Sequence, residues 1–179
     1  MAAITYQIDN AHSHAQFKVR HMMISNVRGE FSKLTGTVVY DPDDPSTSKI
    51  NAEIDVSTVS TCEPQRDEHL KSGDFFDVAR YPTITYSSKG VTAINPTSFV
   101  VAGDLTIRGK TRSVALTVED VTPEAKDPWG NFRRGASAKT RINRKNFGLE
   151  WNMALEAGGF LVGDDIEITI DVELVRPAA

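Results

Sequence analysis

The chain has 179 residues, which fits one domain of ordinary size, so we expect a single domain over residues 1–179. Its formal net charge of -4 argues against a nucleic-acid partner, because nucleic-acid-binding domains usually carry a basic excess. Cys62 is the single cysteine, which excludes an intramolecular disulfide framework and a cysteine-based zinc site.

The amino-terminal segment, MAAITYQIDN, has neither the basic region nor the apolar region of a secretory signal. No apolar run approaches the ~18 residues that a membrane helix needs. The sequence as given therefore predicts a soluble protein of the cytoplasm. A chain trimmed of its signal, and so periplasmic or secreted, would look the same.

Apolar and polar residues alternate along most of the chain, as in half-buried antiparallel strands. In DIEITIDVEL, for example, isoleucine, valine and leucine occupy every second position. Turn-forming residues separate these segments, and about nine evenly spread strands fit an antiparallel sandwich or barrel. In chain order, the expected strands are 4–8, 14–20, 34–40, 49–56, 83–91, 98–107, 112–121, 132–142 and 165–174.

Two segments depart from this alternation and predict short helices. Residues 21–29 place Met23 and Val27 at positions i and i+4 and end in glycine. Residues 63–73 carry Pro64 where a first helical turn tolerates it, and they also end in glycine. Both segments are too short to form a second layer, so we expect two short helices that cover the strands.

Several inward positions of the expected strands are small, namely Ala52, Gly103, Ala136 and Ala138. A closed barrel of about eight strands that is lined by small residues has room for one ligand. Small residues also mark corners at which strands coil tightly, so both interpretations stay open here.

Three of the four histidines lie close together near the amino terminus: His12, His14 and His21. A zinc site needs three or four converging ligands, but the alternation of 14–20 points His14 outward and His21 inward. A set of His12, His21 and His69 would support the alternative function, a metal- or histidine-dependent enzyme on the same barrel. No standard ligand spacing favours that set, so we expect no metal site and place His21 at the mouth of the barrel.

The segment RDEHLKSGDFFD, residues 66–77, groups charged side chains with two aromatic rings. Arg66, Asp67 and His69 have the residue types of a charge relay, but a polar network that holds a helix over the barrel is the simpler interpretation. Phe75 and Phe76 supply a large apolar area, either to close the barrel end or to line a ligand entrance.

The segment GDLTIRGKT superficially matches a phosphate-binding loop, but its glycines are one position too far apart and no helix follows. A tight hairpin turn at Gly109–Lys110 is the better interpretation. The sequence contains neither G-x-S-x-G, H-E-x-x-H nor C-x-x-C. We therefore expect no enzymatic activity, no catalytic residue and no catalytic cofactor.

Residues 128–149 contain six basic side chains and no acidic one. Such a run would attract an anionic headgroup or a membrane surface, whereas the plainer interpretation is a solvated strand face balanced by acids elsewhere. Arg134 has the parity of the inward-facing Phe132, so it points inward unless Gly135 marks a bulge.

Taken together, these motifs resemble the YceI-like family over nearly the whole chain. The resemblance rests on Y-x-I-D-x-x-H-S from Tyr6 to Ser13, on Phe17 and His21, and on RDEHLKSGDFFD as its strongest part. The further motifs are G-x-F at Gly29 and Phe31, YP at Tyr81 and Pro82, GDLTIRGKT, NFG ending at Gly148, and VGD at 162–164.

The resemblance implies a closed, lipocalin-like antiparallel β-barrel around a long apolar tunnel. It also implies a non-catalytic carrier whose bound ligand is an isoprenoid quinone, a polyprenyl phosphate or a fatty-acid-like lipid. Many members carry secretory signals, and this sequence departs from them there. A transient contact with a membrane surface and a homodimer are compatible with such a carrier. A structural protein on this fold would instead have a filled core.

The lipid-binding residues are expected among the inward positions of the strands and at the barrel mouth. Met22, Phe75 and Phe76 are the candidate gates, and His21 and Arg134 are the candidates for the polar end. The expected lining is Phe17, Val19, Val38, Ile54, Ile84, Tyr86, Phe99, Val101 and Leu105.

Overall fold

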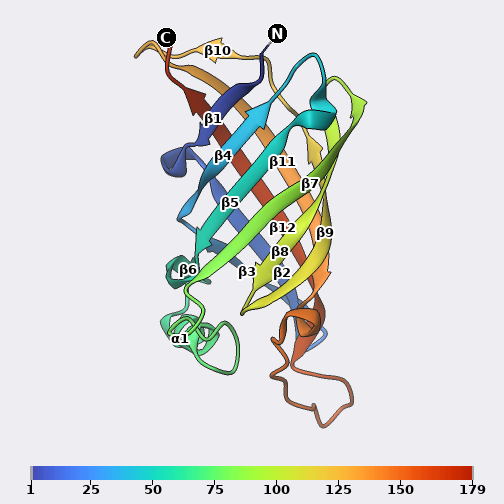
Figure 1. Cartoon of the computed structure of the whole chain (residues 1–179). Helices are drawn as coiled ribbons and strands as arrows, with labels where there is room; N and C mark the ends of the chain where they lie inside the picture. Colours follow the sequence, from blue (N-terminus) through green and yellow to red (C-terminus); the bar gives the residue numbers. More distant parts are fainter. Residues whose placement is uncertain (1, 179) are drawn as a thin grey trace.

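The structure, a computed structural model, describes residues 2–178 and shows a closed antiparallel barrel of lipocalin-like form (Figure 1). The barrel has eight strands in cross-section, and the pairing of β11 with β12 completes the ring. The strands are β1 (Ile4–Ile8), β2 (His14–His21), β3 (Ser25–Phe31), β4 (Leu34–Tyr40), β5 (Lys49–Asp55), β6 (Val59–Ser60), β7 (Thr83–Asn95), β8 (Ser98–Ile107), β9 (Lys110–Glu119), β10 (Ala125–Lys126), β11 (Phe132–Asn143) and β12 (Val162–Arg176).

Three of the eight walls are long strands that break midway and then resume. A 3-10 turn, η1 (Asn10–His12), separates β1 from β2, two residues separate β3 from β4, and η3 (Val56–Thr58) separates β5 from β6. The breaks lie side by side, because the Asn10 side chain accepts the backbone N–H of Leu34 at 2.9 Å. Two further 3-10 turns are η2 (Pro45–Thr47) and η4 (Arg144–Phe147).

The alternation of apolar residues predicts the walls well, and all nine expected strands are confirmed. β1 and β8 coincide with the expected ranges 4–8 and 98–107, whereas β7 and β12 run further, to Asn95 and Arg176. β6 and β10 were not predicted, because strands of two residues leave no periodic signal.

The helix expected over 21–29 is wrong, because these residues form the hairpin between β2 and β3. Met22 and Met23 have φ angles of 50° and 62°, left-handed values that reverse the chain in tight hairpin loops. Met23 and Val27 are four residues apart, a spacing that also occurs on one face of a helix, and this led to the wrong prediction. Val27 and Gly29 instead belong to the inward face of β3, where a glycine hides the two-residue period.

The second expected helix is confirmed as α1 (Pro64–Lys71), which lies at the end of the barrel opposite the two termini (Figure 1). The Glu63 side chain caps it by accepting the Gln65 N–H at 3.3 Å. Beside it at this end lies the loop 149–161 (Figure 1). Within residues 2–178, no helix is both long enough and apolar enough to cross a membrane.

We call this end of the barrel the α1 end, and the opposite end the termini end. The β8–β9 hairpin turns at the α1 end, at Arg108 and Gly109 with φ of 50° and 70°, and Ile107 pairs with Lys110. The turn therefore lies one residue earlier than the expected Gly109–Lys110. A strand follows it, so the segment is no phosphate-binding loop.

Candidate functional site

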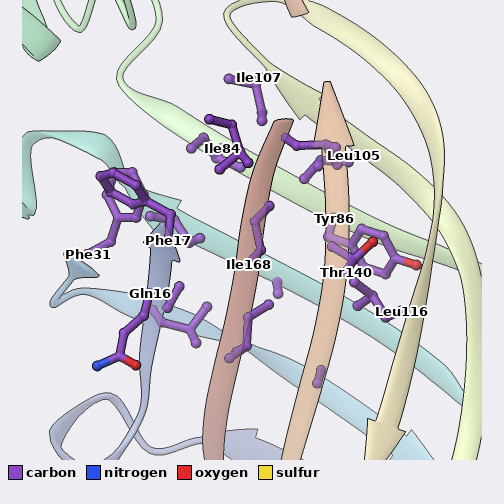
Figure 2. A pocket seen from close by; sticks show the side chains of 18 of the residues that line it. Gln16, Phe17, Phe31, Ile84, Tyr86, Leu105, Ile107, Leu116, Thr140 and Ile168 are labelled. Atoms are coloured by element: carbon purple, nitrogen blue, oxygen red, sulfur yellow. The ribbon is translucent and has the colours of Figure 1, made fainter. Parts of the chain in front are cut away.

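The barrel encloses a cavity of about 570 Å³ that runs between its two ends. Side chains from strands all around the ring point into it, including Phe17, Ile84, Leu105 and Ile168 (Figure 2). Its wall is predominantly aliphatic and aromatic. A filled-core structural protein is therefore not what this chain forms, and the interior can hold a long apolar molecule.

Thirteen of the fourteen side chains selected from the sequence line this cavity, because alternate residues of a strand point to the same side. Met22 is the exception, since it lies in the β2–β3 turn, 42% exposed and outside the lining. The thirteen are Phe17, Val19, His21, Val38, Ile54, Phe75, Phe76, Ile84, Tyr86, Phe99, Val101, Leu105 and Arg134.

The small inward residues have two different roles. Ala52, Ala136 and Ala138 line the cavity and widen it. Gly103 does not, because the Tyr86 ring covers it: a β-carbon at Gly103 would lie 2.7 Å from Tyr86 Cζ. The absence of a side chain at Gly103 thus leaves room for the Tyr86 ring.

Tyr86 brings a buried hydroxyl to the middle of the wall, near Thr140 (Figure 2), and backbone carbonyls satisfy this hydroxyl. It donates a hydrogen bond to the carbonyl of Val114 at 3.0 Å and lies 3.3 Å from that of Val101. Burial raises the pKa of the Tyr86 phenol to about 12, so the group stays neutral. The middle of the cavity therefore offers an apolar surface rather than a reactive group.

The termini end of the cavity is polar. Arg134 points inward, as its parity predicts, and β11 pairs with β12 through Gly135 without a bulge. Its guanidinium carbon lies 4.8 Å from the centre of the Tyr40 ring, and its Nε donates to the carbonyl of Thr122 at 3.0 Å. This places one cation at the mouth of an apolar channel.

Tyr6 and Glu124 complete this polar end. The Tyr6 hydroxyl donates to the Glu124 carboxylate, which also accepts two bonds from Arg176 at 2.6 and 2.8 Å. These Arg176 bonds lower the pKa of Glu124, and burial together with the ionised Glu124 raises the pKa of Tyr6. Glu124 therefore stays ionised beside Arg134.

The α1 end is closed by an aromatic cluster that joins two separate segments. The Trp151 ring lies 4.7 Å from the His69 ring and 5.5 Å from the Phe75 ring, centre to centre. Phe76 extends the cluster into the barrel by an edge contact with Phe31 at 5.7 Å. Loop 149–161 and the α1 segment are thus held against each other across the barrel end.

The polar residues of RDEHLKSGDFFD hold α1 in place and form no charge relay. Arg66 donates to the hydroxyl and carbonyl of Thr61 at 2.7 and 2.9 Å, and Asp67 accepts from the same hydroxyl at 2.6 Å. His69 pairs instead with Asp74, at 2.9 Å. The network interpretation is the one that the contacts support.

Arg144 is a cavity-lining residue that sequence reasoning missed. It is only 3% exposed, and it donates to the carbonyls of Leu149, Trp151 and Gly163 at 2.6, 2.9 and 2.8 Å. Burial lowers the pKa of its guanidinium, and the nearest carboxylate, that of Asp164, lies 3.7 Å away. Its contacts fasten loop 149–161 to the start of β12.

His21 and Arg134 do not share one polar end, contrary to what the sequence suggested. His21 pairs with Val162 at the start of β12, whereas Arg134 pairs with Leu174 near its end. At ~3.3 Å per residue, these positions are roughly 40 Å apart along the strand. The cavity therefore has polar side chains at both ends.

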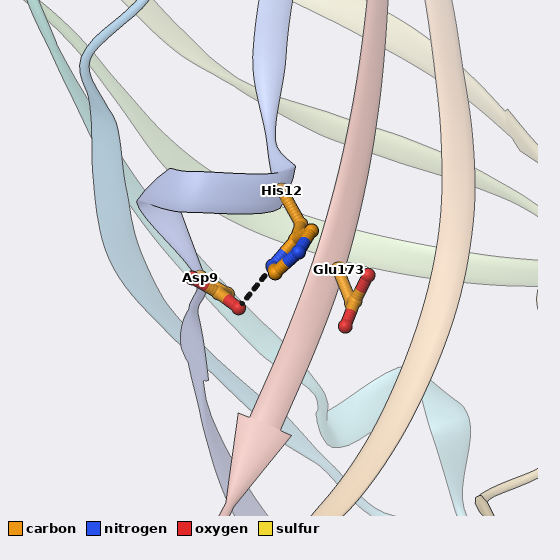
Figure 3. Close-up of side chains that lie close together, drawn as sticks. All are labelled: Asp9, His12 and Glu173. Carbon is orange, nitrogen blue, oxygen red and sulfur yellow. Dashed lines mark hydrogen bonds and ion pairs between the residues drawn. The ribbon is translucent and has the colours of Figure 1, made fainter. Parts of the chain in front are cut away.

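The histidines do not form the metal site of the alternative hypothesis. His12 lies in η1, the break midway along the β1–β2 wall, whereas His21 and His69 lie at the α1 end. His12 is instead grouped with Asp9 and Glu173, whose ligand-type atoms lie within 4.8 Å of one another (Figure 3). The Arg133 guanidinium already bonds both carboxylates, at 2.6 and 2.7 Å, so a cation would have to displace it.

The basic run 128–149 is not a cationic patch. Arg133 pairs with Asp127, Arg141 pairs with Glu167 at 2.6 Å, and Lys145 lies 3.4 Å from Asp164. Acids from other segments thus balance the run, which supports the plainer interpretation of its charge.

Many further lining residues escaped sequence reasoning, and three of them show why. Tyr6 shares the parity of its neighbours Ile4 and Ile8, and that signal could have identified it. Leu149 and Trp151 lie in a loop, where no strand period indicates their direction.

A sequence profile of the YceI-like domain matches residues 6–174. The chain belongs to the YceI-like family. It is 38% identical over 169 residues to the UPF0312 protein SA2479 of Staphylococcus aureus (strain N315), an alignment that covers 94% of this chain and 95% of that protein.

Solved structures show the same barrel. Burkholderia cenocepacia BcnA superposes with a TM-score of 0.81 at 22% identity, covering 93% of this chain and 98% of that one. The Campylobacter jejuni YceI protein superposes with a TM-score of 0.71 at 28% identity, over 88% and 89% of the two chains. A polyisoprenoid-binding domain from Saccharophagus degradans has a TM-score of 0.69 at 14% identity, over 96% and 98%.

Proposed function

We propose that this protein is a non-catalytic carrier of a long isoprenoid lipid, either an isoprenoid quinone or a polyprenyl phosphate, which it holds inside the barrel. The observation that carries the proposal is the apolar cavity of about 570 Å³ that runs between the barrel ends. A relative with this fold, from Saccharophagus degradans, is described as polyisoprenoid-binding, which supports the choice of ligand class.

Burial of the lipid chain supplies the affinity in this proposal. Each Å² of apolar surface removed from water contributes about 25 cal/mol, so a prenyl chain along the cavity needs few polar contacts. Phe17, Leu105 and Val101 offer the methyl groups and ring faces that branched isoprene units would contact. The Tyr86 hydroxyl, already bonded to backbone carbonyls, adds no unsatisfied polar group.

The headgroup of the lipid is proposed to lie at one of the two polar ends. Arg134 at the termini end provides a cation suited to a phosphate. His21 at the α1 end provides a ring nitrogen suited to a quinone carbonyl. Arg134→Gln should weaken retention of a polyprenyl phosphate more than that of a quinone, and His21→Phe should do the reverse.

We propose no catalytic role for the cavity. Two of its titratable groups at the α1 end hold the structure together: His69 pairs with Asp74, and Arg66 donates to Thr61. A nucleophile beside an oriented base, as covalent catalysis needs, is not formed by the described lining residues.

Extraction of the purified protein with organic solvent, followed by mass spectrometry, tests the proposal. A stoichiometric isoprenoid lipid is expected, and Ala138→Trp, which narrows the cavity, should reduce it. The matched control is Lys139→Trp, because this neighbouring side chain points outward and is exposed. Protein that is empty and takes up neither quinone nor prenyl phosphate when offered them would sink the proposal.

A further inference from the structure

The large apolar side chains on the surface are unevenly distributed. Residues 2–178 expose seven of them, and five lie at the α1 end, in two chain reversals: the β2–β3 turn, residues 22–24, and the loop 149–161. The other two lie at the termini end, Ile94 near the end of β7 and Trp129 in the turn after β10. The five are Met22, Met23, Ile24, Met153 and Phe160, which we call the apolar tips.

The apolar tips form one surface. The Met22 N–H donates to the carbonyl of Leu161 at 2.8 Å, and Met23 packs so closely on Gly159 that a β-carbon there would lie 2.0 Å from its sulfur. Within the loop, Phe160 bridges to Ala154. Hydrogen bonds therefore fix the two reversals relative to each other, although their side chains face solvent.

This surface adjoins the cavity. His21, which precedes the β2–β3 turn, lines the cavity, and so do Trp151 and Leu161 of the loop. A partner bound to the apolar tips would therefore lie next to residues that line the cavity.

We propose that the apolar tips dock the protein on a lipid bilayer, with the α1 end facing the membrane. The tips are large exposed side chains gathered at one end of the barrel, and apolar side chains of this kind bury at the boundary of the headgroups and acyl chains of a bilayer. Cations lie beside them: Arg20 donates to the Met23 carbonyl at 3.2 Å, and the Lys145 ammonium lies 6.0 Å from the Phe160 ring centre. Cations at this level complement lipid phosphates.

The apolar side chains, rather than charge, dominate this docking. Glu150 and Glu156 lie in the same loop and offset the two cations, so the surface has no strong basic excess. The protein should therefore bind neutral bilayers as well as anionic ones. Apart from Lys145, which lies beside Phe160, the basic run 128–149 has no part in it, because its cations are largely paired with acids.

Docking in this orientation gives the carried lipid a route between the membrane and the cavity. The route passes between α1 and the loop 149–161, where Trp151 meets His69. This purpose rests on the proposed carrier function, whereas membrane docking itself does not require a bound lipid.

Vesicle flotation of the full chain, as purified, tests the proposal. The probes are vesicles of phosphatidylcholine alone and of phosphatidylcholine with phosphatidylglycerol in equal parts. The wild type should float with both, and the double variant Met23→Ser/Phe160→Ser should bind at least about tenfold more weakly, since two large apolar side chains are lost.

The matched control is Ile94→Ser/Trp129→Ser at the termini end. Ile94 and Met23 are both 60% exposed, so the two double variants remove comparable exposed apolar side chains. Binding that falls only in the first variant supports the proposal. Equal loss in both variants, no flotation of the wild type, or flotation restricted to anionic vesicles and unaffected by Met23→Ser/Phe160→Ser overturns it.

Solvent extraction of the same samples separates this proposal from the carrier function. A wild type that contains isoprenoid lipid but does not float overturns docking alone. A wild type that floats but contains and takes up no lipid overturns the carrier function and leaves docking standing.

Discussion

The Phe17 ring lies over Gly29 on the neighbouring strand, and a β-carbon at Gly29 would lie only 2.3 Å from Phe17 Cζ. The absence of a side chain at one position thus sets the direction of a ring at another. From there Phe17 reaches Phe31 at 5.6 Å between ring centres and lines the cavity. This contact explains why an inward position of β3 is a glycine: the Phe17 ring occupies the space that a side chain at position 29 would fill.

Gly29→Ala should therefore displace the Phe17 ring into the cavity. We expect a loss of about 1–3 kcal/mol in the free energy of unfolding, as for other overpacked sites, together with less bound lipid. Urea denaturation and solvent extraction measure the two effects. Gly90→Ala is the matched control, because a β-carbon there meets open space and should change neither quantity. Equal effects of the two substitutions would contradict this role of Gly29.

Removal of the Tyr86 hydroxyl should cost stability without changing the cavity. Tyr86→Phe loses the bonds to Val114 and Val101, worth about 1 kcal/mol, and keeps the ring over Gly103. Since the folded pKa of about 12 lies above the ordinary value of 10.0, the wild type should lose this stabilisation as the pH rises from 10.0 towards 12. Unfolding measured across that range should show a shallower decline for Tyr86→Phe. An identical decline would refute the assignment.

Asp9 should make part of the stability depend on acid pH. Hydrogen bonds from His12 and Arg133 lower its pKa from 3.8 to about 2, so the ionised carboxylate stabilises the fold at pH values above 3.8. That contribution is lost as the pH falls through about 2. Asp9→Asn should consequently be less stable than the wild type at neutral pH, and the gap should narrow in acid. Asp171→Asn removes a more exposed pair, with His14 at 3.7 Å, and should cost about 0–1 kcal/mol at neutral pH in urea denaturation.

Arg144 should hold loop 149–161 in place. Arg144→Ala leaves the carbonyls of Leu149, Trp151 and Gly163 without their charged donor, at a cost of about 2 kcal/mol or more. Hydrogen exchange should accelerate in residues 149–163. Arg141→Ala removes an exposed pair with Glu167 and should cost about 0–1 kcal/mol, with no faster exchange in the loop. Unchanged protection of the loop in Arg144→Ala would rule out this function of the buried arginine.

The sequence predicts the walls of this barrel because a two-residue period survives wherever a strand faces the cavity on one side and water on the other. It fails at the β2–β3 turn for a physical reason. Met22 and Met23 adopt left-handed backbone conformations that methionine rarely takes, so no turn signal marks them. Gly29 occupies an inward position of β3, where an apolar side chain would have completed the alternation that marks a strand.

The cavity lining was predictable to the same extent as the strands. The alternation of inward and outward residues along β8 and β11 identified Phe99 and Arg134 as lining residues. Trp151 and Arg144 were not predictable, because contacts between distant segments set their directions. The alternation shows which side of the wall a residue faces, but not where it lies along the barrel axis. For this reason His21 and Arg134 were predicted at one end, although they lie at opposite ends.

The three interrupted walls give the barrel two mechanically different sides. β7, β8, β9, β11 and β12 run unbroken, whereas the breaks after β1, β3 and β5 lie next to one another, joined by the Asn10–Leu34 bond and by the Asp55 N–H bond to the Lys33 carbonyl at 3.1 Å. A crease therefore crosses one side of the molecule. Bending along it would change the width of the α1 half of the cavity and leave the strand register of the termini half in place.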